Sequence, residues 1–235
     1  MRIDKFLANA KFGSRKDVKK ILKAKKVFVN GNLVLNDDYQ VKENDIIICD
    51  GKEVKYVEFV YYMLNKPTGY VSATIDNLYP TVVSIIDDYH DIFPVGRLDV
   101  DTTGLLFITN DGELAHNLTS PKKKVDKKYF VKFTGEYNEN IPEEFKKGID
   151  LKDYITKPGI FEKISDDSCY VTIHEGKFHQ VKLMMKAVGL KVIELKRVSF
   201  GPIDLDLNLE EGQYRELTKS ELSILKNIPM EVEGE

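Results

Sequence analysis

The sequence predicts an α+β protein with a small N-terminal domain and a larger second domain. In the first 55 residues, two short amphipathic helical segments precede a small sheet that begins with a hairpin-like pair of strands. From residue 59 onward, short strands and helices alternate irregularly, without the regular βαβ repeats of a parallel sheet. The chain has 235 residues, of which 42% are hydrophobic, enough for one sizeable core and a smaller one. We therefore expect the second domain to contain a mixed, largely antiparallel sheet flanked by helices.

The N-terminal domain is expected to span residues 1–58, including a linker at its end. Ile3, Phe6 and Leu7 have helical spacing, and a second helix should begin after Ser14, which has an aspartate three residues later in a capping-box pattern. VFVNGNLVL places an Asn-Gly pair between two apolar runs, which is the strongest short-range signal for a hairpin. DIIICDG predicts a further strand, and KEVKYVEF is interpreted as the linker.

The second domain is expected to span residues 59–228, and residues 229–235 to form a frayed tail. Its apolar segments predict strands at YYMLN, YVSAT, GLLFITN, KKYFVKFTG, CYVTIHEG and KVIELKR. Helices are predicted near TVVSIID and at GELAHNLTS, IPEEFKKGI, FHQVKLMMKAVG and SELSILKN.

Composition argues against several classes of protein. No run approaches the roughly 18 apolar residues of a membrane span, and the N-terminus lacks a signal-peptide core, so we expect a cytoplasmic protein without membrane association. Cys49 and Cys169 lie far apart in strand-like segments, so we expect two buried thiols rather than a disulfide or a metal site. Neither a glycine-rich phosphate loop nor a nucleophile elbow is present, so no cofactor is expected.

The charge is distributed asymmetrically, although the net charge is only −3. Residues 1–26 contain ten lysines and arginines and two aspartates, whereas residues 203–235 contain nine acidic and three basic residues. This basic N-terminal segment indicates contact with phosphate groups, and a merely solvated helix face is the alternative. The residues expected to make the contact are Arg2, Lys5, Arg15, Lys16, Lys19, Lys20 and Lys23.

Three aspartates in VGRLDVDTTGLLFITNDG are candidates for chemistry. Asp111 precedes a glycine and Asp101 precedes two threonines, so both are interpreted as turn residues. Asp99 follows Gly96 and Arg97 directly before an apolar strand, where glycine permits a sharp turn or the close approach of a ligand. Asp99 is therefore the candidate catalytic carboxylate, with an ordinary turn role as the alternative.

Two further segments could bind an anion beside this loop. His179, Gln180 and Lys182 fall at the start of a predicted helix, where anions are favoured, and Lys182 could neutralise Asp99. SPKKKVDKKYF combines basic residues with Tyr129, a combination suited to following a nucleic-acid backbone while stacking on a base. The alternatives are an exposed lysine on an amphipathic helix and a tyrosine in a core strand. Lys66, which precedes a proline, is interpreted by default as part of a turn.

Together, these motifs resemble known families over nearly the whole chain, from Arg2 to about Leu225. RIDKFL, GSRKDVKKIL and VFVNG are similar to the S4 RNA-binding domain, with Lys25-Lys26 where that family often has a glycine. LNKPTGY, GRLDVDTTGLLFITNDG, KKYFV and EGKFHQVKLM, in this order, resemble the RsuA-type ribosomal RNA pseudouridine synthases.

The resemblance implies an isomerase that detaches uracil from its ribose, turns the ring and rejoins it through C5, without a metal or nucleotide. Asp99 would be the essential carboxylate, as nucleophile or as base, and Lys182 its cationic neighbour at a position often occupied by arginine. Tyr129 would stack on the target base and Arg97 would hold the flipped nucleotide by its phosphate. Further RNA contacts are expected at Lys66, Lys122, Lys123, Lys124, His179 and Gln180.

FHQVK, the PTV segment and LTKSEL resemble the small-subunit member of this family. The implied target is uridine 516 of 16S rRNA, in the RNA's own numbering, within a partly assembled small-subunit particle and with the enzyme as a monomer. The alternatives are a 23S rRNA synthase of the same family and a non-catalytic RNA-binding ribosome-assembly factor.

Overall fold

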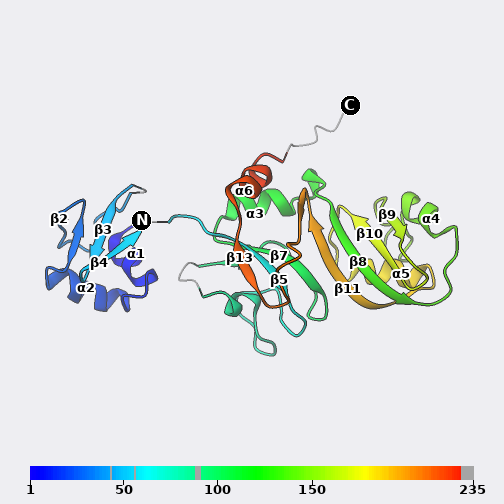
Figure 1. The fold of residues 1–235 in the computed structure, drawn as a ribbon, viewed down its shortest axis with the longest axis horizontal. Helices are drawn as coiled ribbons and strands as arrows, with labels where there is room; N and C mark the ends of the chain where they lie inside the picture. The colour runs from blue at the N-terminus through cyan, green and yellow to red at the C-terminus, as the bar shows by residue number, and fades with distance from the viewer. Residues whose placement is uncertain (43, 56, 88–90, 229–235) are drawn as a thin grey trace. The chain divides into compact units, whose positions relative to one another are not determined.

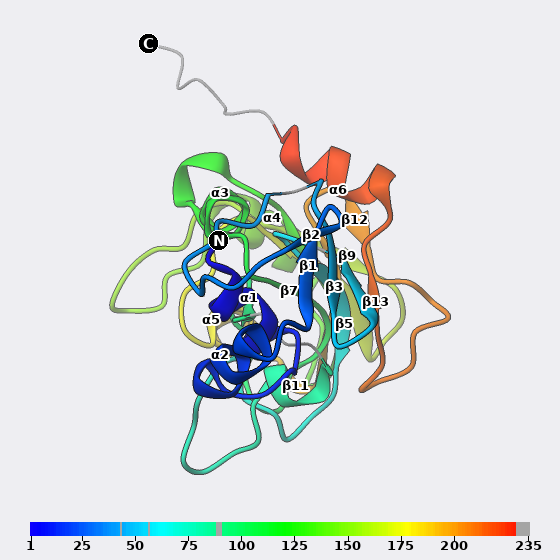
Figure 2. The same ribbon diagram turned by 90° about the vertical axis from the view of Figure 1, so that its left-hand side faces the viewer.

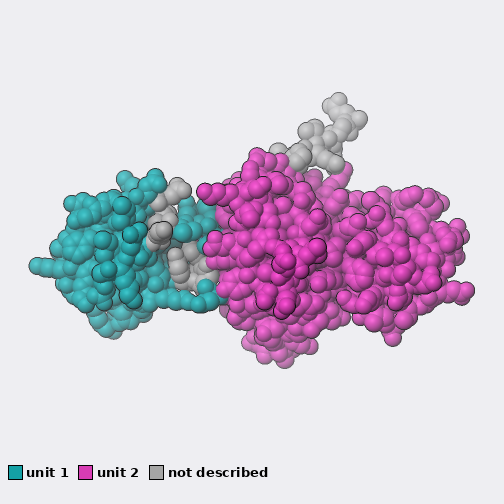
Figure 3. Space-filling view, in the orientation of Figure 1, with its two compact units in different colours: residues 1–60, 87–91 teal, residues 61–86, 92–235 magenta. Residues whose placement is uncertain are grey.

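The computed structural model describes residues 1–42, 44–55, 57–87 and 91–228, so the expected tail at 229–235 lies outside the described residues. The chain divides into two compact units (Figure 3). The first comprises residues 1–60 and 87–91, and the second residues 61–86 and 92–235. None of the helices in the described part of the chain is long and apolar enough to cross a membrane.

The first unit consists of two helices and a small antiparallel sheet. Helices α1 (Ile3–Asn9) and α2 (Arg15–Lys23) lie next to each other (Figure 2). The strands are β1 (Val27–Val29), β2 (Asn32–Leu33), β3 (Ile46–Cys49) and β4 (Lys52–Lys55), in the order β2-β1-β3-β4. Apolar residues of both helices and of the sheet form one core. Residues 52–55, interpreted above as part of a linker, instead pair with β3.

Local sequence signals account for the ends of these elements. The predicted capping box is present, because the Ser14 hydroxyl accepts from the Asp17 N–H while the Asp17 carboxylate accepts from the Ser14 N–H. Asn30 and Gly31 both have positive φ angles, of 51° and 79°, as a tight two-residue hairpin turn requires. The hairpin prediction is confirmed.

The second unit is built on a mixed, largely antiparallel sheet, as predicted (Figure 1). The strand order is β13-β5-β7-β11-β8-β10-β9, and only the β7–β11 pair in this path is parallel. The strands are β5 (Tyr61–Lys66), β7 (Thr103–Thr109), β8 (Lys127–Thr134), β9 (Ile160–Lys163), β10 (Ser168–Ile173), β11 (Lys191–Phe200) and β13 (Tyr214–Glu216). Two short strands lie off this path, with β6 (Phe93–Pro94) paired to β7 and β12 (Ile203–Asp204) paired to β11.

The strand predicted at YVSAT is wrong. Val71 forms only an isolated bridge with Thr81. The neighbouring Ser72 uses its side chain instead, since its hydroxyl donates to the Leu98 carbonyl (2.9 Å) and accepts from the Leu98 N–H (3.0 Å). This segment therefore hydrogen-bonds to the loop that carries Asp99 and does not pair as a strand of the sheet.

Helices flank the sheet close to the predicted positions. They are α3 (Gly112–Thr119), α4 (Ile141–Lys147), α5 (Gln180–Ala187) and α6 (Lys219–Lys226), with 3-10 turns at Val82–Ile85 and Pro121–Lys123. Helix α5 packs against β11, and α3 packs against α6. Cys49 and Cys169 are buried as expected, and burial raises their thiol pKa values to about 11 and about 12, so both remain protonated at neutral pH.

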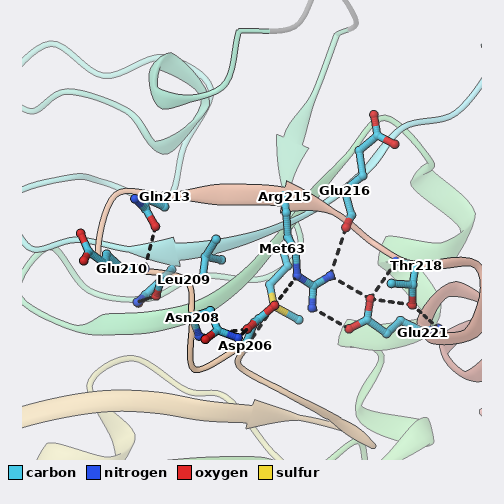
Figure 4. A network of polar contacts seen from close by, with 11 residues as sticks. Met63, Asp206, Asn208, Leu209, Glu210, Gln213, Arg215, Glu216, Thr218 and Glu221 are labelled. Carbon is cyan, nitrogen blue, oxygen red and sulfur yellow. Dashed lines mark hydrogen bonds and ion pairs between the residues drawn. The ribbon is translucent and has the colours of Figure 1, made fainter.

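A polar network fixes the chain between β12 and α6 (Figure 4). Arg215 contacts the carboxylates of Asp206 at 2.7 Å and Glu221 at 2.8 Å, and Glu221 also completes a capping box with Thr218 at the start of α6. Hydrogen bonds from Arg215 lower the pKa of Glu221 to about 2. The Asp206 N–H donates to the Met63 sulfur, so the network also anchors this segment to β5.

Candidate active site

The loop between β6 and β7 carries Asp99 and is shaped by two local features. Gly96 has a φ of +73°, the left-handed conformation that glycine adopts without strain, as expected from its position. Further along, the Thr102 N–H donates to the Asp99 carbonyl at 3.1 Å, which closes a turn. The Asp99 side chain is 25% exposed, so it borders solvent without being fully hydrated.

Lys66 holds this loop from inside the protein. It is fully buried at the end of β5, and its ammonium group donates to the carbonyl oxygens of Pro67 (3.0 Å), Asp99 (3.0 Å) and Thr102 (2.9 Å). Burial lowers the Lys66 pKa to about 8, against the opposing effect of the Asp101 and Asp99 carboxylates. The prediction that Lys66 contacts RNA is corrected, because a side chain with no exposed surface has no face to offer a ligand.

The Lys182 ammonium lies between two carboxylates. It is 2.8 Å from Asp99 Oδ2 and 2.6 Å from Asp101 Oδ1, and His179 Nε2 approaches Asp99 Oδ1 at 3.6 Å. Burial would lower the Lys182 pKa, but hydrogen bonds to Asp101 and Asp99 raise it above its usual value. The predicted pairing of Lys182 with Asp99 is therefore present.

Asp101 lies in the turn that the Thr102 N–H and the Asp99 carbonyl close, as interpreted from the sequence, and its side chain makes a further contact. The largely exposed side chain of Asp101 contacts the Lys182 ammonium group that also pairs with Asp99. Asp111 is structural as expected, because its side chain caps helix α3. Its carboxylate accepts from the Leu114 N–H at 3.0 Å and from the Tyr61 hydroxyl at 2.8 Å.

Tyr129 and Arg97 form the wall of the site. Tyr129 lies on β8 and is only 7% exposed, so it is both a core strand residue and a lining residue. Both side chains line a hollow of about 60 Å³ that contains Asp99 and His179, and both also line an adjoining hollow of about 430 Å³. Among the described residues, Arg97 forms no ion pair, and it is exposed, so its guanidinium is available to an anion.

Arg197, which the sequence interpretation missed, supports Tyr129. It lies opposite Tyr129 in the β8–β11 pairing and is 1% exposed; burial lowers the Arg197 pKa, and interaction with the Tyr129 side chain opposes that effect. Its Nε donates to the Leu105 carbonyl at 2.7 Å, and its guanidinium lies 4.7 Å from the centre of the Phe200 ring. An arginine inside the apolar strand segment KVIELKRVSF is the only sequence signal for this role.

Gln180 is largely buried and hydrogen-bonded within the protein. It is 3% exposed, its amide group donates to Glu175 (2.7 Å), and its amide oxygen accepts from the Lys177 N–H (3.0 Å). It therefore fixes the loop before α5, and it also lines the hollow that contains Asp99. His179, which precedes it, is exposed and has a left-handed φ of 51°.

The other predicted basic residues of the second unit differ in their exposure to solvent. Lys122 and Lys124 are exposed, whereas Lys123 is half-buried and donates to the Ile228 carbonyl at 3.1 Å. This segment begins at Pro121, which lines the larger hollow. The cations at 122–124 therefore lie near that hollow.

In the first unit, the two predicted arginines are held by a buried acid. Arg2 and Arg15 lie 3.1 Å and 2.7 Å from the carboxylate of Asp4, which has no exposed surface. Burial would raise the Asp4 pKa, but hydrogen bonds from Arg15 and Arg2 lower it below its usual value. Both arginines remain about half exposed, and the side chain of Lys5 is half exposed as well.

The predicted lysines of α2 divide into two kinds. Lys19 and Lys20 pair with nearby aspartates at 2.7 and 2.9 Å. Lys16 and Lys23 are exposed and have no ion-pair partner among the described residues. All four follow the i, i+3/i+4, i+7 spacing that places side chains on one face of a helix. We call these four residues the lysine stripe.

Comparison with known proteins identifies the family. The sequence matches the family model described as RNA pseudouridylate synthase over residues 60–187, and the S4 domain model over residues 1–47. The chain belongs to the RNA pseudouridylate synthase family. Its first unit contains the S4 domain, as the sequence motifs indicated, and the candidate site lies in the second.

Relatives of this pseudouridylate synthase match it from end to end. An uncharacterised RNA pseudouridine synthase of Bacillus subtilis is 44% identical, covering 96% of this chain and 98% of the relative. The ribosomal small subunit pseudouridine synthases A of Vibrio cholerae and Escherichia coli K12 are 40% and 38% identical, covering 95% of this chain and 98% and 99% of theirs. A crystal structure of a pseudouridylate synthase is 38% identical, with a TM-score of 0.68 and coverage of 96% and 99%.

Proposed function

We propose that this protein converts uridine 516 of 16S rRNA to pseudouridine, with Asp99 as the essential carboxylate. The observation that carries the proposal is the Asp99 carboxylate held 2.8 Å from Lys182 at a hollow lined by Tyr129 and Arg97. A negative group, a fixed cation, an aromatic ring and a free guanidinium are the groups needed to take hold of a flipped nucleotide.

The residues suit the chemistry of this isomerisation. The bond between ribose C1′ and uracil N1 breaks, the ring turns, and a C1′–C5 bond forms as the proton on C5 is lost. Asp99 acts either by attacking C1′ or by removing a proton from the sugar, and both roles use its carboxylate form. Lys182 fixes the orientation of that carboxylate, Tyr129 stacks on the uracil, and Arg97 binds a flanking phosphate.

The substrate assignment rests on relatives and on the S4 domain. Two relatives that match over almost their full lengths are named ribosomal small subunit pseudouridine synthase A. The S4 domain adds a lysine stripe that is suited to RNA phosphates. We infer that the protein acts as a monomer, in the cytoplasm, on RNA in a partly assembled small-subunit particle.

The proposal is tested with 16S and 23S rRNA transcripts that carry tritium at uracil C5, with and without bound ribosomal proteins. Formation of the C1′–C5 bond expels the tritium, so its release reports the reaction directly. We expect release from 16S RNA alone, and its loss in Asp99→Asn with RNA affinity nearly unchanged. The control is Asp166→Asn, which alters a fully exposed aspartate on the same unit and should remain active.

Other outcomes would overturn parts of this proposal. Release from 23S RNA would reassign the substrate to the large subunit. Normal release by Asp99→Asn would remove Asp99 from the reaction. If wild-type protein binds both RNAs and releases no tritium from either, even with ribosomal proteins present, a ribosome-assembly role becomes the better explanation.

A further inference from the structure

Phe178 is an exposed aromatic residue next to the candidate active site. It lies between β10 and α5, and 74% of its surface is accessible to solvent. Its ring stacks on the imidazole of His179, with centroids 3.7 Å apart and an angle of 21° between the planes. His179 Nε2 in turn lies 3.6 Å from Asp99 Oδ1. Two stacked rings therefore lead from the candidate catalytic carboxylate outward to solvent.

Hydrogen bonds fix the loop that carries this ring pair. On one side, buried Gln180 hydrogen-bonds to Glu175 and to the Lys177 N–H. Glu175 also accepts from the Lys157 N–H at 2.8 Å, which ties the loop to the segment before β9. His179 adopts a left-handed backbone conformation that few residues other than glycine favour. The fold thus presents a large apolar ring to water beside the candidate site.

The Phe178 ring lies outside the small hollow around Asp99, which indicates that it contacts a base other than the target uracil. The volume of this hollow is about 60 Å³, and Phe178 is not among its lining residues. A uracil that reaches Asp99 must leave its stack in the RNA, which exposes the face of the neighbouring base. An apolar side chain that enters the vacated place restores the lost stacking.

We propose that Phe178 stacks on the RNA base next to the target uridine and occupies the place that the uracil leaves when it turns into the site. This inference rests on the proposed function and concerns how the RNA is opened. The charges around the ring favour RNA as its occupant. Lys177, which precedes Phe178 in the chain, is exposed, and Lys182 on the following helix α5 contacts Asp99, so cations that can bind RNA phosphates lie on both chain segments next to Phe178.

The test uses a 16S rRNA fragment with 2-aminopurine next to the target uridine. Fluorescence then reports stacking of the neighbouring base, and tritium release under single-turnover conditions at saturating RNA reports the reaction. Four variants are compared with the wild type: Phe178→Ala, Phe178→Leu, Phe178→Tyr and, as a matched control, Leu207→Ala. Leu207 is 99% exposed in the same unit, so its truncation removes a comparable exposed apolar side chain.

We expect Phe178→Ala to lower the single-turnover rate about tenfold and to leave the 2-aminopurine signal unquenched, because one base–aromatic stack is lost. Phe178→Tyr should behave as wild type, Phe178→Leu should fall between them, and Leu207→Ala should change nothing. The loss in Phe178→Ala should shrink on a single-stranded RNA whose target uridine is already unstacked.

A wild-type rate in Phe178→Ala, or equal losses in Phe178→Ala and Phe178→Tyr, would overturn the inference. A loss of the same size on stacked and unstacked RNA would also overturn it, because the ring would then not act through opening of the RNA. Inactive wild-type protein on every rRNA would instead refute the proposed function, so the two failures are distinguishable. Because Phe178 is exposed, we expect the melting temperatures of its variants to match that of the wild type.

Discussion

Lys66 has no exposed surface, yet its ammonium group sets the position of the loop that carries Asp99. Lys66→Met keeps a side chain of similar length but removes the donor, which leaves the carbonyl oxygens of Asp99 and Thr102 without this partner. We expect tritium release at saturating RNA to fall about 100-fold, because a small displacement of a reacting group is costly, while RNA affinity changes less than about twofold.

The exposed Lys122 provides the matched control for this prediction. Lys122→Met should weaken RNA binding and leave the saturated rate unchanged, which is the opposite pattern. Equilibrium binding and single-turnover rates are measured for both variants. Weakened binding with a normal saturated rate in Lys66→Met would mean that Lys66 contacts RNA after all.

Lys182 and Lys66 show which features of the site a sequence pattern can predict and which it cannot. The pairing of Lys182 with Asp99 was predictable, because the helix start that follows HEGKFH supplies a cation for a nearby acid. The inward orientation of Lys66 was not, since the carbonyl groups that bind it come mainly from residues more than 30 positions later in the chain. The hydrogen bonds of Gln180 were not predictable for a similar reason, because its partners are set by the folded loop.

Strands β7 and β11 bring the two halves of the site together. They pair in parallel where Gly104 lies opposite Arg197. Gly104 follows the Asp99 loop on β7, and Arg197 on β11 also lies opposite Tyr129 of β8. Gly104 has a φ of +100°, and a Cβ atom added there would lie 2.2 Å from the Arg197 carbonyl oxygen. Gly104→Ala should therefore lower the free energy of unfolding by about 3 kcal/mol.

Gly112→Ala is the control for this prediction, measured by urea unfolding alongside Gly104→Ala. Gly112 opens α3, its φ lies outside the left-handed region, and no atom lies within 4 Å of an added Cβ. This variant should be as stable as the wild type or more stable by up to about 1 kcal/mol, since alanine favours helix. Equal stability of both variants would show that the close approach of β7 and β11 tolerates a side chain.

Elements with a local signal were predictable, and those that depend on distant partners were less so. The capping box at Ser14 and the Asn30-Gly31 hairpin are determined by residues within four positions of each other. In contrast, YVSAT has the composition of a strand but lacks a ladder partner, and 52–55 became a strand because β3 offered a free edge. The parallel pairing of β7 with β11 joins residues more than 90 positions apart.

At the scale of the whole molecule, the S4 domain adds a concentrated positive charge to a chain whose net charge is −3. The members of its lysine stripe are not equivalent, because Lys19 and Lys20 already pair with aspartates while Lys16 and Lys23 do not. When a lysine binds an RNA phosphate, a counterion is released from the RNA. A lysine without an ion-pair partner in the protein can do so without breaking an existing ion pair. Lys16 and Lys23 should therefore dominate the salt dependence of binding.

We predict that Lys16→Ala/Lys23→Ala reduces the slope of log affinity against log salt by about 1.5, since each lost phosphate contact removes about 0.7 to 0.9. The saturated rate of tritium release should stay unchanged, because both residues lie outside the unit that holds Asp99. Lys146→Ala/Lys147→Ala, on exposed positions of α4, removes the same charge from the second unit and should leave the slope nearly as in the wild type. Equal slopes in the two double variants would mean that the lysine stripe acts only through the overall charge of the protein. A lower saturated rate in Lys16→Ala/Lys23→Ala would mean that the S4 domain also positions the RNA for reaction.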